Sequence, residues 1–233
     1  MKYFLTLIIT LSISVMMAQS NANVTKNTGE IFGRASNASL SSYGAFATFF
    51  NPKKAIDGSV YLFSGWKNYA GIFTNDNQKF SLNNINLNIE RNTFESKTSE
   101  DSIFTFSFNN IDKFVVNNKI FKNFYYNNDN RIFEMIYESD EFSILKGYRV
   151  ILIEGSANPM VNRKNSKLVQ KSSYYIMKGK SISPFKLSKK KVLGLVEDNP
   201  DRIKKIEQYA KDNNLSYKKA YDVQRMLAFS SSN

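Results

Sequence analysis

Apolar and polar residues alternate in short runs along the middle of the chain, the pattern of antiparallel β-strands. Ile85, Leu87 and Ile89 are separated by asparagines, which places the apolar side chains on one face of a half-buried strand and the Asn side chains on the other. Asn117-Asn118 interrupts an apolar run in the manner of a two-residue hairpin turn. Strands are expected over residues 60–63, 70–73, 80–89, 103–111, 114–116, 120–121, 131–139, 143–154 and 172–177.

The pattern changes to helical spacing near the end of the chain. Ser188 can cap a helix over residues 189–196. Asn199, Pro200 and Asp201 supply an N-cap, a first-turn proline and a first-turn acid for a second helix. Ser216 is expected to open a third helix.

These elements predict a mainly β fold with a C-terminal α-helical segment. Turn signals recur about every 8–12 residues, which favours an antiparallel sandwich, barrel or curled meander. The antiparallel β-domain is expected over residues 55–186, and about three short helices are expected to cap it over residues 187–233. Residues 23–54, rich in Ser, Asn, Ala and Gly, are expected to form a flexible lead-in.

The first 22 residues have the organisation of a secretory signal peptide. Lys2 provides a positive charge, an apolar run extends to Met17, and small residues allow cleavage after Ala18 or Ala22. The run is shorter than the roughly 20 residues that span a bilayer, and no transmembrane segment is expected in the mature chain. The chain has no cysteine, so a bacterial lipid anchor on that residue is excluded. Export is therefore expected, with the periplasm as the first destination and the extracellular space as the second.

Positive charge is concentrated in one part of the sequence. The chain carries 32 Lys and Arg against 20 Asp and Glu, and no acidic residue occurs between Glu154 and Glu197. Such a segment can attract an anionic surface, a glycan or an acidic protein, although a solvated basic face is an equally good interpretation. Nucleic acid fits poorly with export.

The residue inventory disfavours catalysis and metal binding. The chain has no histidine and no cysteine, which excludes Ser-His-Asp triads, Cys nucleophiles and the common zinc sites; no cofactor motif is present. Glu134 and Glu138 lie four apart on one face of a predicted strand, a spacing compatible with a glycosidase-like pair, but acids at such positions are usually solvated charges. Ser188-Lys189 is better interpreted as a helix N-cap than as a catalytic dyad.

Aromatic residues beside lysines are the candidate binding residues. Such rings can stack on sugars or enter a partner's surface, although most are expected to complete the β core. The candidate binding set is Trp66, Tyr69, Tyr174, Tyr175, Lys178, Lys180, Lys189, Lys190 and Lys191.

Three segments carry a resemblance to known proteins, and one of them is the strand in which Ile85, Leu87 and Ile89 alternate with asparagine. Residues 58–66 read Gly-Ser-Val-Tyr-Leu-Phe-Ser-Gly-Trp, and Tyr-Tyr-Ile at 174–176 precedes a lysine-rich helical ending. The arrangement resembles secreted or periplasmic proteins of Bacteroidota, most of them uncharacterised, and is similar to the periplasmic plug subunit of the type 9 secretion translocon. The resemblance covers residues 55–228 and implies an accessory or interaction protein; it supplies no active-site residue. Cargo of that system ends in a β-sandwich sorting domain, whereas this chain ends in helices, which implies retention in the periplasm.

Three functions remain open. The first is a non-enzymatic interaction protein of the bacterial envelope, with an envelope protein or outer-membrane complex as its partner. The second is a protein that binds carbohydrate or anionic glycan, and the third is a carboxylate-based hydrolase that uses Glu134 and Glu138.

Overall fold

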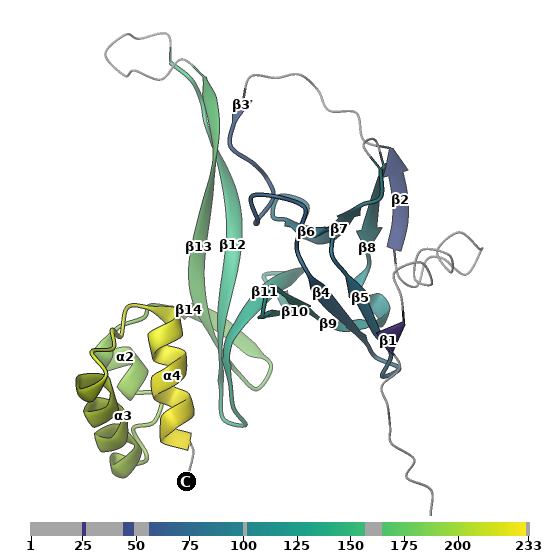
Figure 1. Ribbon diagram of the computed structural model, residues 1–233. Helices are drawn as coiled ribbons and strands as arrows, with labels where there is room; N and C mark the ends of the chain where they lie inside the picture. Colours follow the sequence, from purple (N-terminus) through teal and green to yellow (C-terminus); the bar gives the residue numbers. More distant parts are fainter. Residues whose placement is uncertain (1–24, 27–43, 49–55, 100–101, 157–164, 232–233) are drawn as a thin grey trace, which may run out of the picture.

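The computed structural model describes residues 25–26, 44–48, 56–99, 102–156 and 165–231. The expected signal peptide and most of the expected lead-in lie outside these residues. The described chain is mainly β, with mostly antiparallel sheets and three C-terminal helices, which confirms the predicted fold class (Figure 1). None of the described helices combines the length and the apolar character needed to cross a bilayer.

Two sheets contain the strands. The larger has the order β1-β5-β4-β9-β10-β11-β12-β13-β14, with β3 paired to β13, and the smaller has the order β2-β8-β7-β6. Neighbours are antiparallel except that β1 pairs with β5, and β3 with β13, in parallel. The strands are β1 Thr25–Lys26, β2 Gly44–Thr48, β3 Ile56–Asp57, β4 Ala70–Thr74, β5 Lys79–Leu82, β6 Ile85–Asn88, β7 Thr93–Lys97, β8 Ser102–Phe106, β9 Ile111–Val116, β10 Lys119–Tyr126, β11 Asp129–Glu138, β12 Ser143–Ile153, β13 Ser166–Lys178 and β14 Ser181–Phe185.

The smaller sheet packs on β4, β5, β9 and β10 of the larger sheet through an aromatic core, so this half of the molecule is a sandwich (Figure 1). Phe94 of β7 is fully buried; its ring stacks on Phe114 at a centroid distance of 4.3 Å and meets Phe121 edge-on at 5.3 Å. Phe104 and Phe106 of β8 continue the same core. Both sheets therefore depend on one shared apolar layer.

Asparagine turns join successive strands of the larger sheet, and the turn at Asn117-Asn118 lies where a hairpin was predicted. Asn117 and Asn118 have φ angles of 48° and 64° and connect β9 to β10. Asn127 and Asn128 do the same between β10 and β11, with φ angles of 57° and 64°. Two successive residues with positive φ match the right-handed twist of a hairpin, and asparagine tolerates that conformation better than most residues.

The prediction of a strand over residues 60–63 is wrong. This segment bends across β6, and its only strand-like pairing is a single bridge from Tyr61 to Asn88. The backbone bonds to β6 are irregular: the Leu62 N–H donates to the Leu87 carbonyl, whereas the Phe63 N–H donates to the Asn86 side chain at 3.0 Å. The asparagine face of β6 is consequently covered, and Asn86 and Asn88 are buried rather than half-exposed.

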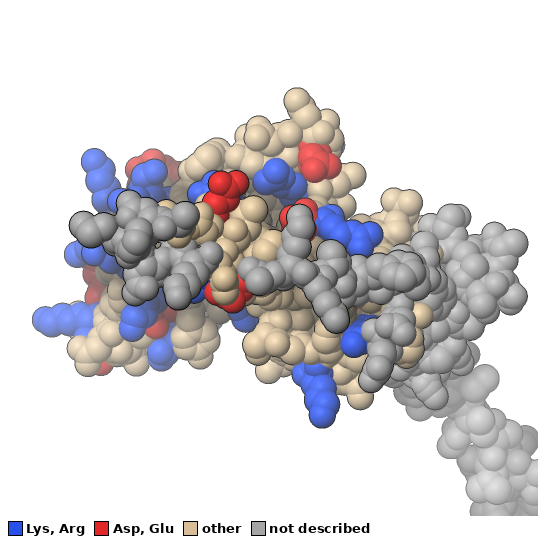
Figure 2. Space-filling model, turned by 90° about the horizontal axis from the view of Figure 1, so that it is seen from above, with Lys and Arg blue, Asp and Glu red and all other residues tan. Residues whose placement is uncertain are grey.

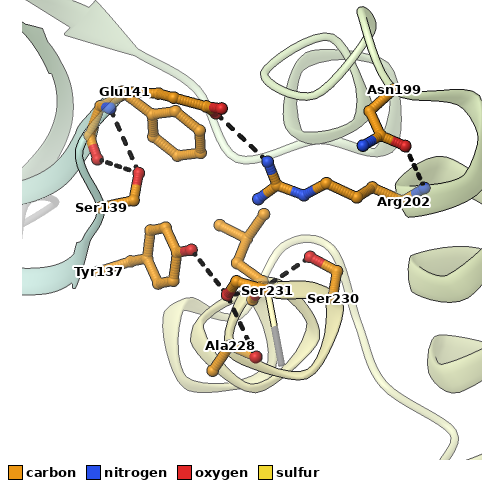
Figure 3. A network of polar contacts seen from close by, with 10 residues as sticks. Tyr137, Ser139, Glu141, Asn199, Arg202, Ala228, Ser230 and Ser231 are labelled. Carbon is orange, nitrogen blue, oxygen red and sulfur yellow. Dashed lines mark hydrogen bonds and ion pairs between the residues drawn. The ribbon is translucent and has the colours of Figure 1, made fainter. Parts of the chain in front are cut away.

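Three helices pack on β11, β12 and β14 through a second core that includes Tyr137, Ile144, Val192, Ile206 and Met226. They are α2 Lys189–Leu193, α3 Pro200–Asp212 and α4 Ala220–Ser231. The third helix begins four residues later than expected, because Ser216 instead forms a turn whose hydroxyl accepts from the Lys218 N–H. Figure 3 shows the polar contacts of this cap: Arg202 pairs with Glu141 at 3.3 Å, and the hydroxyl groups of Tyr137 and Ser231 lie 3.2 Å apart.

The start of α3 permits a direct test of local stability. The Asn199 side chain accepts from the Arg202 N–H at 3.0 Å (Figure 3). We expect Asn199→Ala to lower the free energy of unfolding by about 1 kcal/mol, because one helix N–H loses its acceptor. The urea midpoint measures this loss, and Asn199→Asp, which retains the acceptor, is the control. Equal midpoints for the two variants would contradict this role of the cap.

Candidate functional site

A pocket of about 280 Å³ lies where β11 and β12 diverge. The two strands pair from Glu138 and Ser143 as far as Phe133 and Gly147. Beyond this point β11 stays with β10, whereas β12 continues with β13 to Ile153. The residues that line this β11–β12 pocket are Ile89, Glu90, Asn92, Asp129, Arg131, Ile132, Phe133, Gly147, Tyr148, Arg149, Val150, Ser173 and Tyr175.

Glycine at position 147 allows two aromatic rings to meet at the pocket. A Cβ atom there would lie 3.0 Å from the Tyr175 ring and 3.1 Å from the Phe133 ring. The two rings contact each other edge-on with centroids 5.3 Å apart, and Tyr126 packs against both. A larger residue at this position would displace one of the rings, because buried packing leaves little free space.

Asn92 takes the place of a strand beside β11. Its side-chain Nδ2 donates to the Asn130 carbonyl at 2.7 Å, and its Oδ1 accepts from the Ile132 N–H at 3.0 Å. These two bonds satisfy the backbone of β11 where β12 has moved away. Asn92 itself has a φ of 52°, so the turn between β6 and β7 depends on a residue that accepts this backbone.

Charged side chains of both signs surround the β11–β12 pocket. Arg131 and Arg149 would lie directly opposite each other if the β11–β12 register continued, and neither forms an ion pair within the described part of the chain. Glu90 and Asp129 lie on the walls. Lys171 is the cross-strand partner of Arg149 on β13, so two cations face each other at the entrance to the arm that β12 and β13 form.

The structure separates the candidate binding residues into three places. Trp66 is half-buried against Tyr61, with ring centroids 4.7 Å apart, and Tyr69 is 62% exposed beside β4. The strands β9, β10, β11 and β12 lie between β4 and β13, which carries both tyrosines of the basic segment. Tyr174 and Tyr175 point to opposite faces of β13, because successive side chains of a strand alternate; only Tyr175 lines the β11–β12 pocket.

The candidate lysines lie at the turn after β13 and on α2. Lys178 and Lys180 flank Gly179 and are exposed. Lys189 pairs with Glu207 at 2.7 Å, and Lys191 lies 6.0 Å from the Phe185 ring centroid, while Lys190 is exposed. On the face drawn in Figure 2, basic side chains are distributed over the molecule with acidic side chains among them, so the charge run in the sequence does not form one uniform patch there.

The expectation that Glu134 and Glu138 share a face is wrong. A β-bulge at Ile136 shifts the register, so that Glu134 lies opposite Lys146 and Glu138 lies opposite Ser143. Cross-strand partners share a face, and positions 143 and 146 of a regular strand lie on opposite faces. The two carboxylates therefore do not face a common substrate.

Each of these glutamates has its own lysine partner. The Lys119 Nζ atom lies 3.2 Å from Glu134 Oε1, and the Lys122 Nζ atom lies 3.0 Å from Glu138 Oε1. Glu134 is buried and also accepts from the Tyr148 hydroxyl. Burial raises the pKa of Tyr148, and the nearby Glu134 carboxylate raises it further, so this tyrosine remains a protonated hydrogen-bond donor at neutral pH. Within the described residues, no three Asp or Glu side chains gather in a way that could hold a metal ion.

Asn92, Arg131 and Arg149 were not identified from the sequence as candidate site residues. Each looks like an ordinary turn or strand residue, and their meeting depends on where β12 leaves β11. The sequence pattern did not mark this point, because the strand expected over residues 172–177 is β13, which has 13 residues and extends with the 11-residue β12 beyond the end of the β11 pairing. Comparison with models of protein families, with curated proteins and with solved structures found no match to this chain.

Proposed function

We propose that this protein is a non-enzymatic exported interaction protein of the bacterial envelope that acts in the periplasm as an accessory subunit of an outer-membrane protein-translocation complex. The observation that carries the proposal is the β12–β13 arm, formed by residues 148–153 and 166–172 (Figure 1). The arm extends beyond the paired part of β11 and presents aliphatic side chains, of which Leu152 is 49% exposed. A projecting two-stranded ribbon with apolar surface is suited to docking on another protein.

The carboxylate geometry supports a binding role over hydrolysis. Retaining and inverting glycosidases both need two carboxyl groups that flank one bond. Glu134 and Glu138 lie on opposite faces of β11, and each is neutralised by a different lysine.

Site-specific crosslinking in the native bacterium tests the proposal. Because the sequence has no cysteine, Leu152→Cys introduces a single thiol on the arm. We expect this variant to form a covalent complex with an envelope protein when cells are treated with a short thiol-reactive crosslinker. Tyr221→Cys, at a 69% exposed position on α4, is the matched control and should remain a monomer. Recovery of both variants only as free monomers would refute the proposed function.

Glycan binding is the second candidate, and the β11–β12 pocket is the observation that favours it. Planar polar side chains such as Asn92, Asp129 and Arg131 line the pocket together with Tyr175, a combination that suits hydrogen bonding and stacking with a sugar. Isothermal titration with envelope polysaccharides should then give heat that Tyr175→Ala abolishes. Absence of heat with the wild-type chain would remove this candidate.

A further inference from the structure

The edge of β12 beyond Gly147 has no strand beside it within the described chain. β11 pairs with β12 only as far as the Phe133–Gly147 pair, whereas β12 continues to Ile153. Residues 148–153 thus leave one side of the strand without a ladder over about 20 Å, at roughly 3.4 Å per residue. An edge of this length is a template for pairing with another chain.

Within the described residues, contacts cover the neighbouring edges but not this one. Asn92 bonds the backbone of β11, as described above. On the other side of the arm, β3 pairs with Ser166 and Lys167 of β13. Gly58 approaches so closely there that a Cβ would lie 2.4 Å from the Leu168 carbonyl oxygen. The β12 edge is therefore the position at which an added strand would continue the sheet.

Apart from the charge of Arg149, the sequence of this edge lacks the features that usually prevent pairing. Residues 148–153 contain no proline and no lysine, and their register with β13 is continuous without a bulge. Four consecutive aliphatic residues, from position 150 to position 153, follow Arg149. Natural sheets protect exposed edges with prolines, lysines or bulges, so an unprotected edge of this kind is suited to a partner.

Positive charge identifies the chemistry of the partner. Arg149 and Lys171 are direct cross-strand neighbours, and like charges in this arrangement destabilise a strand pair. Arg131 lines the same pocket as Arg149 and has no ion pair among the described residues. The two acids of the pocket, Glu90 and Asp129, lie on its walls. The arm itself has basic residues and no acidic residue, so its charge is positive. An acidic side chain next to Arg149 would relieve this repulsion, whereas a second copy of this chain carries the same net positive charge of +12.

We infer that the edge of β12 at residues 148–153 accepts an extended acidic segment of another protein by β-strand addition. Main-chain bonds to the edge supply the affinity, and a carboxylate of the partner lies beside Arg149, on the side of β12 that faces Arg131 of β11. This inference rests on the proposed function and specifies the partner's chemistry and its docking position.

A designed peptide tests strand addition directly. The probe is a fluorescein-labelled peptide of eight residues that alternates valine and threonine and carries two glutamates at one end. We expect the full mature protein to bind it, and to bind an analogue with lysines in place of the glutamates at least tenfold more weakly. A peptide with identical side chains but N-methylated at every residue cannot donate to a strand, and its binding should be lost.

Charge reversal on the protein provides the matched comparison. We expect Arg149→Glu to weaken binding of the acidic peptide roughly tenfold or more. The same change at Lys205, an exposed cation on α3, should leave it unchanged. Arg149→Glu also places opposite charges across β12 and β13, so its thermal midpoint should not fall below that of the wild type.

The outcomes separate the inference from the proposed function. Failure of the acidic peptide to bind, or equal binding of the N-methylated peptide, would overturn strand addition. Displacement of the peptide by oligogalacturonate, with the same dependence on Arg149 and no dependence on the peptide N–H groups, would assign the site to an anionic glycan instead. If Leu152→Cys still crosslinks to an envelope protein and Arg149→Glu does not reduce that product, the interaction function stands and the acidic strand is refuted.

Discussion

Replacing Phe94 by alanine is expected to lower the free energy of unfolding by about 3–5 kcal/mol. The side chain is fully buried and is the contact at which β7 of the smaller sheet meets Phe114 and Phe121 of the larger sheet. Its loss removes apolar area from the core and leaves a cavity that neither sheet can close alone, because each is held by its own hydrogen-bond ladder. A domain has about 5–15 kcal/mol of total stability, so this is a large fraction.

Urea unfolding followed by circular dichroism measures the effect, and the fluorescence of Trp66, the only tryptophan, gives a second probe. Tyr125→Ala is the control, because this aromatic residue is 68% exposed and its removal should change the stability by about 0.5 kcal/mol or less. A similar loss for Phe94→Ala and Tyr125→Ala would show that the two sheets do not share the core described above.

Local signals in the sequence predicted the elements that form from neighbouring residues. Asn117-Asn118 indicated a hairpin, and two residues of positive φ occur there. Asn199 and Pro200 indicated a helix start, and α3 begins at Pro200 with Asn199 as its cap. Each of these signals reflects the backbone conformations that a residue's own side chain favours. Such local preferences do not depend on tertiary contacts.

Features that depend on residues far apart in the chain were not predicted from the sequence. The bulge at Ile136 reverses the face of Glu138 relative to Glu134, because one extra residue changes the alternation along the rest of the strand. The β11–β12 pocket likewise arises where two strands separate, and no residue within either strand marks that point. The aromatic candidates Tyr174 and Tyr175 were adjacent in the sequence, yet alternation sends one toward the helical core and the other toward the pocket.

The asparagines of β6 are the most informative exception. Their alternation with Ile85 and Leu87 predicted a half-buried strand, yet all four residues of β6 are buried. The segment that includes Tyr61 and Phe63 covers the polar face, and buried polar groups must then find partners. Asn88 and the Tyr61 hydroxyl both bond Glu95, which is fully buried and also paired with Arg91 at 3.1 Å.

Asn86 occupies the centre of this polar face. It is 1% exposed, and its Oδ1 accepts from the Phe63 N–H at 3.0 Å and from the Leu87 N–H at 2.9 Å. Its Nδ2 donates to the carbonyls of Phe63 and Gly65, each at 2.9 Å. The Asn86 side chain thus makes hydrogen bonds to the segment over β6 that a regular strand would make with its backbone. Because all of its polar atoms are bonded, a polar residue is tolerated in this buried position.

Asn86→Ala should therefore lower the free energy of unfolding by about 3 kcal/mol, because it leaves several buried backbone groups without a partner at once. Asn83→Ala removes the same side chain from an exposed position three residues earlier and should change the stability by about 0.5 kcal/mol or less. Asn86→Asp keeps the oxygen that accepts both N–H groups but turns a second oxygen toward the two carbonyls. Its loss of stability should therefore be greater at pH 7 than at pH 4, where a protonated carboxyl can donate one bond. Urea midpoints at the two pH values, corrected for the wild-type change, measure these differences. Equal losses for Asn83→Ala and Asn86→Ala would mean that the segment over β6 is held by its apolar contacts alone.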